Sequence, residues 1–193
     1  MRGTDQLDSS LDDALMRQAA TGDAAAFTRL VASHARRCGA LAARLMGNRS
    51  EAEDIVQDAF TRLWLKAPDW QPGGAQVSTW LYRVVVNLCL DRKRKPRSES
   101  IEAAAQIVDP TPRSDDLMLM AERQQRVQRA VATLPDRQRA ALALCHFEEL
   151  SNAEAAAILE INVGALESLL VRARRSLRDL LSDLAPQAAK RTA

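Results

Sequence analysis

Apolar residues recur along most of the chain at spacings of three and four, which is the period of an amphipathic α-helix. The first long stripe consists of Phe27, Leu30, Val31, His34, Cys38, Leu41 and Leu45. A Thr-Gly-Asp break at 21–23 divides the stretch 11–45 into a short helix and a longer one. Gly47 suits the left-handed residue that ends a helix, so we expect the longer helix to stop there. Residues 1–10 are polar, and we expect them to form a mobile arm.

The next helix is predicted over 51–66, where Ser50 and Glu53 have the spacing of a capping box. Its polar face is acidic. Asp54 and Asp58 lie one turn apart there, and like charges at that spacing destabilise a helix by a few tenths of a kcal/mol unless a partner neutralises them. The preference for acids near a helix N-terminus explains the acids of the first turn but not Asp58. We therefore expect this face to bind a basic protein partner.

Residues 68–77 contain two prolines and two glycines, which predicts a loop. Ser78 or Thr79 would cap the helix that follows, and Pro96 would stop it. The end of that helix carries five basic residues among the seven positions 91–97. The favourable interaction of cations with a helix C-terminus is one explanation. The aromatic and polar side chains that precede them favour a second, namely a surface that contacts single-stranded nucleic acid or its backbone.

The composition changes at 96–115, where three prolines and several Ser and Asp residues predict a flexible linker. Helical periodicity returns after it, with helices expected over 115–133 and 136–149. Ser151 and Glu154 have the spacing of a second capping box. We therefore expect an all-α fold of two small helical domains. The expected divisions are a mobile arm at 1–10, a first domain at 11–95, a linker at 96–115, a second domain at 116–184 and a tail at 185–193.

The second domain contains a short helix at 153–159, a turn at 160–162 and a long amphipathic helix from Val163 to about Leu184, which match a helix-turn-helix. Any helical bundle can contain such a pair, so the pattern alone leaves DNA binding open. The exposed face of the long helix favours it, because small or polar residues near its start could approach base edges and arginines further along could reach phosphates. The residues concerned are Gly164, Ala165, Glu167, Ser168, Arg172, Arg174 and Arg175.

Composition supports the helical prediction, since 34 of the 193 residues are Ala and 25 are Leu, whereas Val and Ile together number 16. The net charge is only +2, from 27 basic and 25 acidic residues, which is low for a protein that binds nucleic acid by bulk electrostatics. The charge is instead segregated by helix, with acid at 51–58 and base at 92–97 and 172–178. We therefore expect the free chain to bind duplex DNA weakly.

In three segments the chain resembles the extracytoplasmic-function (ECF) sigma factors of bacterial RNA polymerase. The segments are AEDIVQDAFTRLW (52–64), STWLYRVVVNLCLDRKRK (78–95) and LPDRQRAALAL…LSNAEAAAILEINVGALESLLVRARRSLR (134–178). The resemblance covers about residues 12–184 in the order of the family, a region 2 domain followed by a linker and a region 4 domain. It implies an alternative sigma factor that binds core polymerase and directs promoter-specific transcription initiation in a stress response.

The resemblance also implies roles for single residues. The helix 51–66 would dock on the clamp helices of the polymerase β′ subunit through Asp54, Gln57 and Asp58. The loop 68–77 and the helix after it would hold open the promoter −10 element and capture a flipped-out base of the non-template strand. The candidate −10 residues are Trp80, Arg83, Asn87, Arg92, Lys93 and Arg94. The long helix would enter the major groove of the −35 element, and the first helices of the second domain would contact the flap tip of the β subunit.

Two positions of the long helix depart from the family pattern. Many members carry Lys and Arg where this chain has Glu167 and Leu169. A glutamate can accept a hydrogen bond from cytosine N4, and a leucine can pack on a thymine methyl group. We therefore expect a promoter preference that differs from those of relatives.

Other functions find less support in the sequence. Cys38, Cys89 and Cys145 form no CxxC pair, and no catalytic, metal-binding or phosphate-loop motif occurs, so we expect neither an enzyme nor a cofactor. The polar start is not a signal peptide and no apolar run is long enough to insert in a membrane, which predicts a cytoplasmic protein. The family resemblance adds an inhibitory anti-sigma partner. The alternative is an autonomous helix-turn-helix regulator, which leaves residues 51–95 unexplained.

Overall fold

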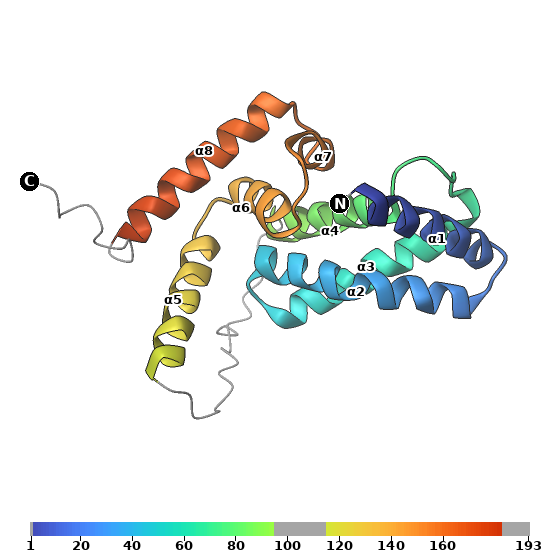
Figure 1. Cartoon of the computed structure of the whole chain (residues 1–193), viewed down its shortest axis with the longest axis horizontal. Helices are drawn as coiled ribbons and strands as arrows, with labels where there is room; N and C mark the ends of the chain where they lie inside the picture. Colours follow the sequence, from blue (N-terminus) through green and yellow to red (C-terminus); the bar gives the residue numbers. More distant parts are fainter. Residues whose placement is uncertain (1, 95–114, 183–193) are drawn as a thin grey trace, which may run out of the picture.

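Helices make up all the regular structure in the residues that the computed structural model describes, 2–94 and 115–182. Two groups of helices lie at opposite sides of the molecule (Figure 1). The first group is α1 (Arg2–Ala20), α2 (Ala24–Met46), α3 (Arg49–Lys66) and α4 (Val77–Arg94). The second group is α5 (Asp115–Ala132), α6 (Asp136–Leu142), α7 (Asn152–Ile158) and α8 (Val163–Leu180). Short helical segments follow α3 and α6, namely η1 (Ala67–Asp69) and η2 (Ala143–Phe147). The predicted all-α fold with two helical domains is confirmed.

Local signals explain where several helices begin and end. The side chain of Asp23 caps α2 by accepting hydrogen bonds from two backbone N–H groups of its first turn. Gly47 ends α2 with a φ of 74°, in the left-handed region that favours glycine. Ser151 and Glu154 form a capping box at the start of α7. The predicted break at 21–23, the stop at Gly47 and the second capping box are therefore confirmed.

The starts of α3 and α4 differ from the prediction. The capping box of Ser50 and Glu53 does not form, because the side chain of Asn48 stands two residues earlier and accepts from the backbone N–H of Ser50 at 2.9 Å. Glu53 instead accepts a hydrogen bond from Arg49, with 2.9 Å between Oε1 and Nε. The helix α4 begins at Val77, one residue before the expected cap, and the side chain of Val77 is buried.

The first ten residues also differ from the prediction. Residues 2–10 are helical and continue into the rest of α1, where a mobile arm was expected. The stretch has no proline and its glycine stands near its beginning, so nothing in it breaks a helix. Buried side chains further along hold α1 against the bundle: Leu15, Met16 and Ala19. The predicted linker at 96–115, apart from its last residue, and the predicted tail at 185–193 lie outside the described residues.

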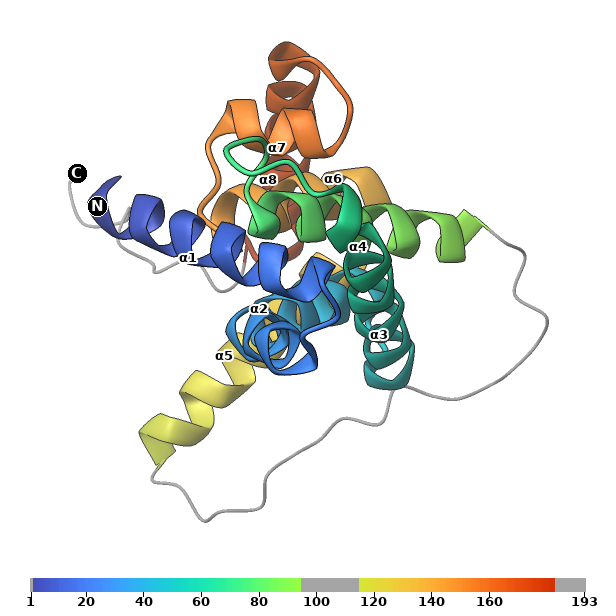
Figure 2. The same ribbon diagram turned by 90° about the vertical axis from the view of Figure 1, so that its right-hand side faces the viewer.

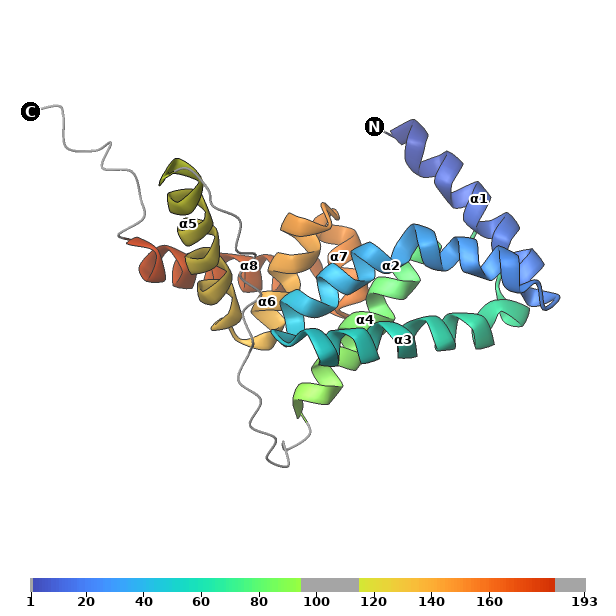
Figure 3. The ribbon, with the colours of Figure 1, turned by 90° about the horizontal axis from the view of Figure 1, so that it is seen from below.

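One hydrophobic cluster runs through both groups of helices. It includes Leu41 and Leu81 from the first group and Leu144 and Leu166 from the second, all with no exposed surface. The helices α6 and α7 contact α4, and α6 and η2 contact α2. Figure 2 shows α6 and α7 against α4, and Figure 3 shows α5 crossing α8 at the far end of the second group. The two domains are thus packed together in this structure.

Burial predicts how the thiols react. Burial raises the pKa of Cys38 and of Cys89 to about 12, and it also raises the pKa of the half-buried Cys145. We expect iodoacetamide at pH 8 to modify Cys145 first and to leave the other two intact, as measured by mass spectrometry of the native protein. Denaturation in urea should expose all three as a control. Labelling of Cys38 at the rate of Cys145 would contradict this assignment.

The same two thiols give a pH dependence of stability. An unfolded thiol releases its proton near its ordinary pKa of about 8.5, whereas Cys38 and Cys89 in the folded chain keep theirs up to about 12. The two protonated thiols therefore contribute to the stability of the folded state. This contribution is fully present below their ordinary pKa and is lost as the pH rises toward 12.

Candidate functional site

The exposed side of α3 carries the residues that the sequence assigned to a protein partner. Asp54, Gln57 and Asp58 are all exposed, at the spacings of one helix face. Asp54 forms an ion pair with Arg92 of α4, with 3.5 Å between Oδ2 and Nη1. Within 2–94 and 115–182, Asp58 has no ion-pair partner. Its charge is therefore available to a second molecule.

Sequence reasoning missed an apolar residue on the same face. Leu65 lies two turns beyond Asp58 and is 69% exposed, so its apolar side chain is available to a partner. We call Asp54, Gln57, Asp58 and Leu65 the α3 face. Leu65 follows Asp58 by two helix turns, a spacing that places both residues on one face. This spacing was the signal in the sequence that could have revealed Leu65.

An apolar groove of about 770 Å³ runs between α2 and α3, beside the α3 face. Phe27, Val31, Val56, Phe60 and Trp64 are among the side chains that line it. Phe27 and Trp64 meet edge to face, with ring centroids 4.9 Å apart. An amphipathic helix of a partner could place its apolar side chains in such a groove. We call it the α2–α3 groove.

The six candidate −10 residues do not share one surface. Trp80, Arg83, Asn87 and Arg94 follow one line along α4 at spacings of three, four and seven, and we call these four the α4 face. Arg92 points to α3, where it pairs with Asp54. Lys93 points to the second domain and pairs with Asp136 of α6 at 3.2 Å. The structure thus brings four candidates together and separates two.

The loop between α3 and α4 lies next to the start of the α4 face. Its Trp70 is half-buried and meets Trp80 edge to face, with 6.3 Å between ring centroids and an angle of 84°. Gly73 has a φ of 75°, which turns the chain sharply inside the loop. The two indole rings therefore lie together at the position where the sequence predicts capture of a base.

The second domain contains the predicted helix-turn-helix, formed by α7 and α8. The turn between them includes Glu160 with a φ of 54°, and Asn162 caps α8 by accepting from the backbone N–H of Ala165 at 2.7 Å. The candidate −35 residues Gly164, Glu167, Ser168, Arg172, Arg174 and Arg175 are exposed, and Ala165 is half-buried. The long helix thus presents polar and basic side chains outward.

Leu169, which could pack on a thymine methyl group, is half-buried and packs against the hydrophobic cluster of the two domains. Val171, which sequence reasoning missed, is 63% exposed and lies between Glu167 and Arg175 on the outward face. The period of the helix separates the two positions by about half a turn, and this could have been read from the sequence.

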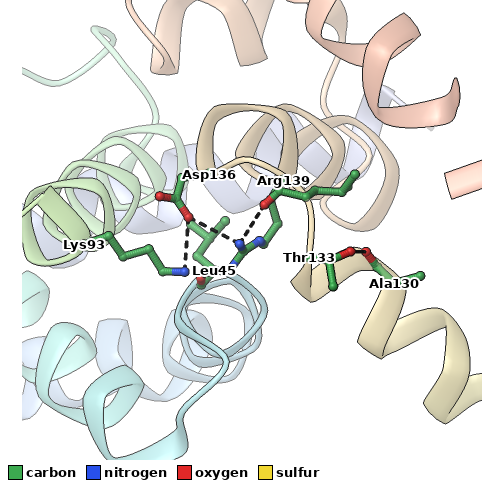
Figure 4. Close-up of polar contacts among 7 residues, drawn as sticks. Leu45, Lys93, Ala130, Thr133, Asp136 and Arg139 are labelled. Carbon is green, nitrogen blue, oxygen red and sulfur yellow. Dashed lines mark hydrogen bonds and ion pairs between the residues drawn. The ribbon is translucent and has the colours of Figure 1, made fainter. Parts of the chain in front are cut away.

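The contact between the two domains is centred on a buried arginine (Figure 4). Arg139 of α6 is 6% exposed and donates from Nη1 to the backbone carbonyl of Leu45 in α2 at 2.7 Å. Its Nη2 donates to the carbonyl of Leu134 at 2.8 Å and lies 3.3 Å from Asp136. Burial lowers the pKa of the guanidinium, and Asp136 opposes that shift. Asp136 also holds Lys93, so α2, α4 and α6 meet in one polar cluster.

Further polar contacts cross between the domains. Glu148 has a side chain only 5% exposed, accepts a hydrogen bond from the hydroxyl of Tyr82 at 3.0 Å and pairs with Arg44 at 3.3 Å. Arg83 of the α4 face donates to the carbonyl of Ala157 at the end of α7, at 3.0 Å. Part of the candidate −10 surface is therefore occupied by the second domain. We call this packing of the domains the closed arrangement.

Comparison with known proteins divides the chain into the same two domains. The family model described as Sigma-70 region 2 matches residues 30–99, and the one described as Sigma-70, region 4 matches residues 124–177. The ECF RNA polymerase sigma factor SigW of Bacillus subtilis is 33% identical over 180 residues, which cover 88% of this chain and 96% of SigW. The chain belongs to the ECF sigma factors. The α3 face and the α4 face of this sigma factor lie in the region 2 match, and α8 lies in the region 4 match up to residue 177.

Other similar members come from distant bacteria. The sigma-E factor of Escherichia coli is 31% identical over 188 residues, covering 90% of this sigma factor and 95% of the relative. SigE of Mycolicibacterium smegmatis is 37% identical over 174 residues, which cover 84% of this chain. This chain spans only 65% of the length of that mycobacterial protein.

Two solved structures resemble this sigma factor over most of its chain. CnrH, in complex with the cytosolic domain of CnrY, gives a TM-score of 0.66 at 30% identity and covers 90% of this chain and 98% of its own. RpoE of Bartonella quintana, in complex with the anti-sigma factor NepR, gives 0.65 at 26% identity and covers 81% and 96%. None of the helices in the described part of this sigma factor has the length and hydrophobicity that a membrane crossing needs.

Proposed function

We propose that this sigma factor binds core RNA polymerase through the α3 face and places the −10 and −35 elements of a restricted set of promoters against the α4 face and α8. The observation that carries the proposal is the exposed Asp58, which has no ion-pair partner in the described residues and shares a helix face with the exposed Leu65, on the same chain as a helix-turn-helix. An acid-and-leucine face suits a basic helical partner such as the β′ clamp helices. We further propose that it acts in the cytoplasm, and by binding to polymerase and DNA.

Promoter binding would require the closed arrangement to open. In the closed arrangement Arg83 donates to the carbonyl of Ala157 and pairs with Glu160 at 3.7 Å, so fewer of its N–H groups are available to a DNA phosphate. Lys93 is likewise engaged with Asp136. Core polymerase would therefore favour the open arrangement by binding it more tightly than the closed one. This explains why a chain of net charge +2 would need its polymerase to bind a promoter.

Two apolar grooves would receive further partners. The α2–α3 groove is proposed to take an apolar helix of an anti-sigma factor, which would thereby cover the approach to the α3 face. A second groove of about 460 Å³ lies between α5, η2 and α8 and includes Val131, Phe147 and Leu177 in its lining. We assign it to the flap tip of the β subunit, because its lining includes the first helices of the second domain, where the family resemblance places that contact.

Reconstitution tests the proposal. Core polymerase with the purified chain should produce promoter-dependent transcripts from a genomic template, and core alone should not. The absence of such transcripts would overturn the proposal. Tight binding of the free chain to duplex DNA, with no effect of core polymerase, would support the autonomous regulator instead.

Glu167 gives a prediction for promoter preference. Its carboxylate is exposed, and Asn152 of α7 donates to it at 3.4 Å, which holds it near the start of α8. Replacing Glu167 by Ala should relax the preference at one position of the −35 element, with a loss of discrimination of about 1–3 kcal/mol. Transcription from single-base promoter variants measures it. Asp179→Ala, on the same helix, changes the net charge equally and should leave every preference intact; an equal shift for all variants with Glu167→Ala would show that Glu167 reads no base.

A further inference from the structure

Asp13 of α1 accepts two hydrogen bonds from the loop between α3 and α4. The indole Nε1–H of Trp70 donates to Oδ1 at 3.0 Å, and the backbone N–H of Gly73 donates to Oδ2 at 2.9 Å. Both carboxylate oxygens are therefore used, and they hold residues that lie 57 and 60 positions further along the chain. Hydrogen bonds to an ionised acceptor are among the stronger ones in proteins.

These two bonds fix the loop at the points that determine its shape. Gly73 is the residue with a φ of 75°, and the N–H of the next residue, Gly74, closes a turn on the carbonyl of Gln71 at 3.2 Å. Trp70 is the side chain that meets Trp80 edge to face. One carboxylate thus sets both the turn of the loop and the ring that stands beside the α4 face.

The carboxylate itself is held firmly. The neighbouring Asp12 pairs with His34 of α2, with 2.8 Å between Oδ2 and Nε2, and both side chains are mostly buried. One turn of α1 further on, Leu15 and Met16 are buried in the hydrophobic cluster. The position of Asp13 is therefore set by the packing of α1 against α2 and against η1, the segment at the start of the loop.

We propose that Asp13 is a positioning residue for recognition of the −10 element. Through Trp70 and Gly73 it prearranges the loop that, with Trp80, would receive an unstacked base of the non-template strand. A base that leaves the stack loses stacking energy, and a binding surface that is already shaped avoids the further cost of ordering the loop. The inference rests on the proposed function, and it adds a residue of α1 to a surface otherwise formed by the loop and α4.

The test uses holoenzyme assembled from core polymerase and the full chain. The probe is a set of promoters with every single-base change in the −10 and −35 elements, together with −10 DNA carrying 2-aminopurine in the non-template strand. With Asp13→Ala, we expect discrimination at the captured −10 base to fall about ten-fold, which is the effect of losing one hydrogen bond to a charged group. The 2-aminopurine fluorescence of the captured base should fall with it. Affinity for core polymerase and discrimination at every −35 position should stay as in the natural chain.

Matched variants separate positioning from loss of folding. Asp23→Asn makes the same change of charge but keeps a good helix N-cap, so it should leave −10 discrimination unchanged. Trp70→Phe keeps an aromatic ring, although a smaller one, and removes the Nε1–H donor, so its effect should be smaller than that of Asp13→Ala. The double variant should lose less than the product of the two single effects, because both act on one hydrogen bond.

Several results would overturn the inference. Unchanged −10 discrimination with Asp13→Ala would do so while leaving the proposed function standing, provided that the natural holoenzyme transcribes from the promoter. An equal loss at −10 and −35 positions, or a loss of core binding, would reduce Asp13 to a structural role in α1. If the natural holoenzyme gives no promoter-dependent transcript, the proposed function fails before Asp13 is tested.

Discussion

Replacing Asp58 by Arg should lower the affinity for core polymerase about 10- to 100-fold while the helical fold stays intact. The carboxylate is exposed and has no ion-pair partner in the described part of the chain, so reversing its charge removes nothing from the folded protein. At an interface with a basic partner, however, the variant would place like charges together, which costs on the order of 1.5–3 kcal/mol. A titration of labelled chain with core polymerase measures the affinity, and circular dichroism checks the fold.

Two controls make the result specific. Glu122→Arg changes the net charge by the same amount at an exposed position of α5 that does not line the second groove, so it should leave core binding unchanged. Arg62→Glu lies near the α3 face with the opposite change of charge, so it should strengthen binding or leave it unchanged. A loss of affinity with Arg62→Glu as large as that with Asp58→Arg would contradict an electrostatic role for the face.

Arg139→Met should loosen the closed arrangement and lower the free energy of unfolding by about 2–4 kcal/mol, because it leaves the carbonyls of Leu45 and Leu134 without a donor. The methionine retains an apolar stem of similar length, so the expected loss is of hydrogen bonds more than of packing. Small-angle scattering should give a larger radius of gyration than that of the natural chain. Thermal unfolding measures the loss of stability.

A second variant separates opening from unfolding. Tyr82→Phe keeps the buried ring in the first domain and removes only the hydroxyl that donates to Glu148. It should shift the radius of gyration in the same direction with a smaller loss of stability. If both variants keep the scattering profile of the natural chain, these polar contacts do not hold the domains together.

The helices could be predicted from the sequence because each helix buries one face. The apolar residues of that face therefore recur at spacings of three and four. The boundaries at Gly47 and at Ser151 followed for a similar reason, since both depend on residues within one turn. The prediction of the α3 cap was wrong because two local signals competed. Asn48 precedes Ser50 in the chain, and its side chain accepts hydrogen bonds from the first N–H groups of the helix. Local competition of this kind is decided by geometry that the order of residues does not contain.

The contacts between distant segments could not be predicted. Arg139 stands in a run of charged and polar residues typical of a solvent-exposed helix, yet it is buried because its partner is a carbonyl 94 positions earlier. Asp13 likewise looks like an ordinary polar residue of α1. Of the candidate −10 residues, the sequence identified the line along α4, whereas the separate partners of Arg92 and Lys93 depend on how α3 and α6 lie beside it.

The hydrogen bond from Arg139 to Leu45 bears on how the chain is made. The carbonyl of Leu45 belongs to the last turn of α2, where helix carbonyls have no partner within the helix. During synthesis the first domain leaves the ribosome well before residue 139, so α2 must first form with that carbonyl bound to water. The first domain therefore reaches its final hydrogen bonding only after α6 has emerged and docked. A ribosome stalled before residue 139 would carry a first domain whose longest helix still lacks this bond.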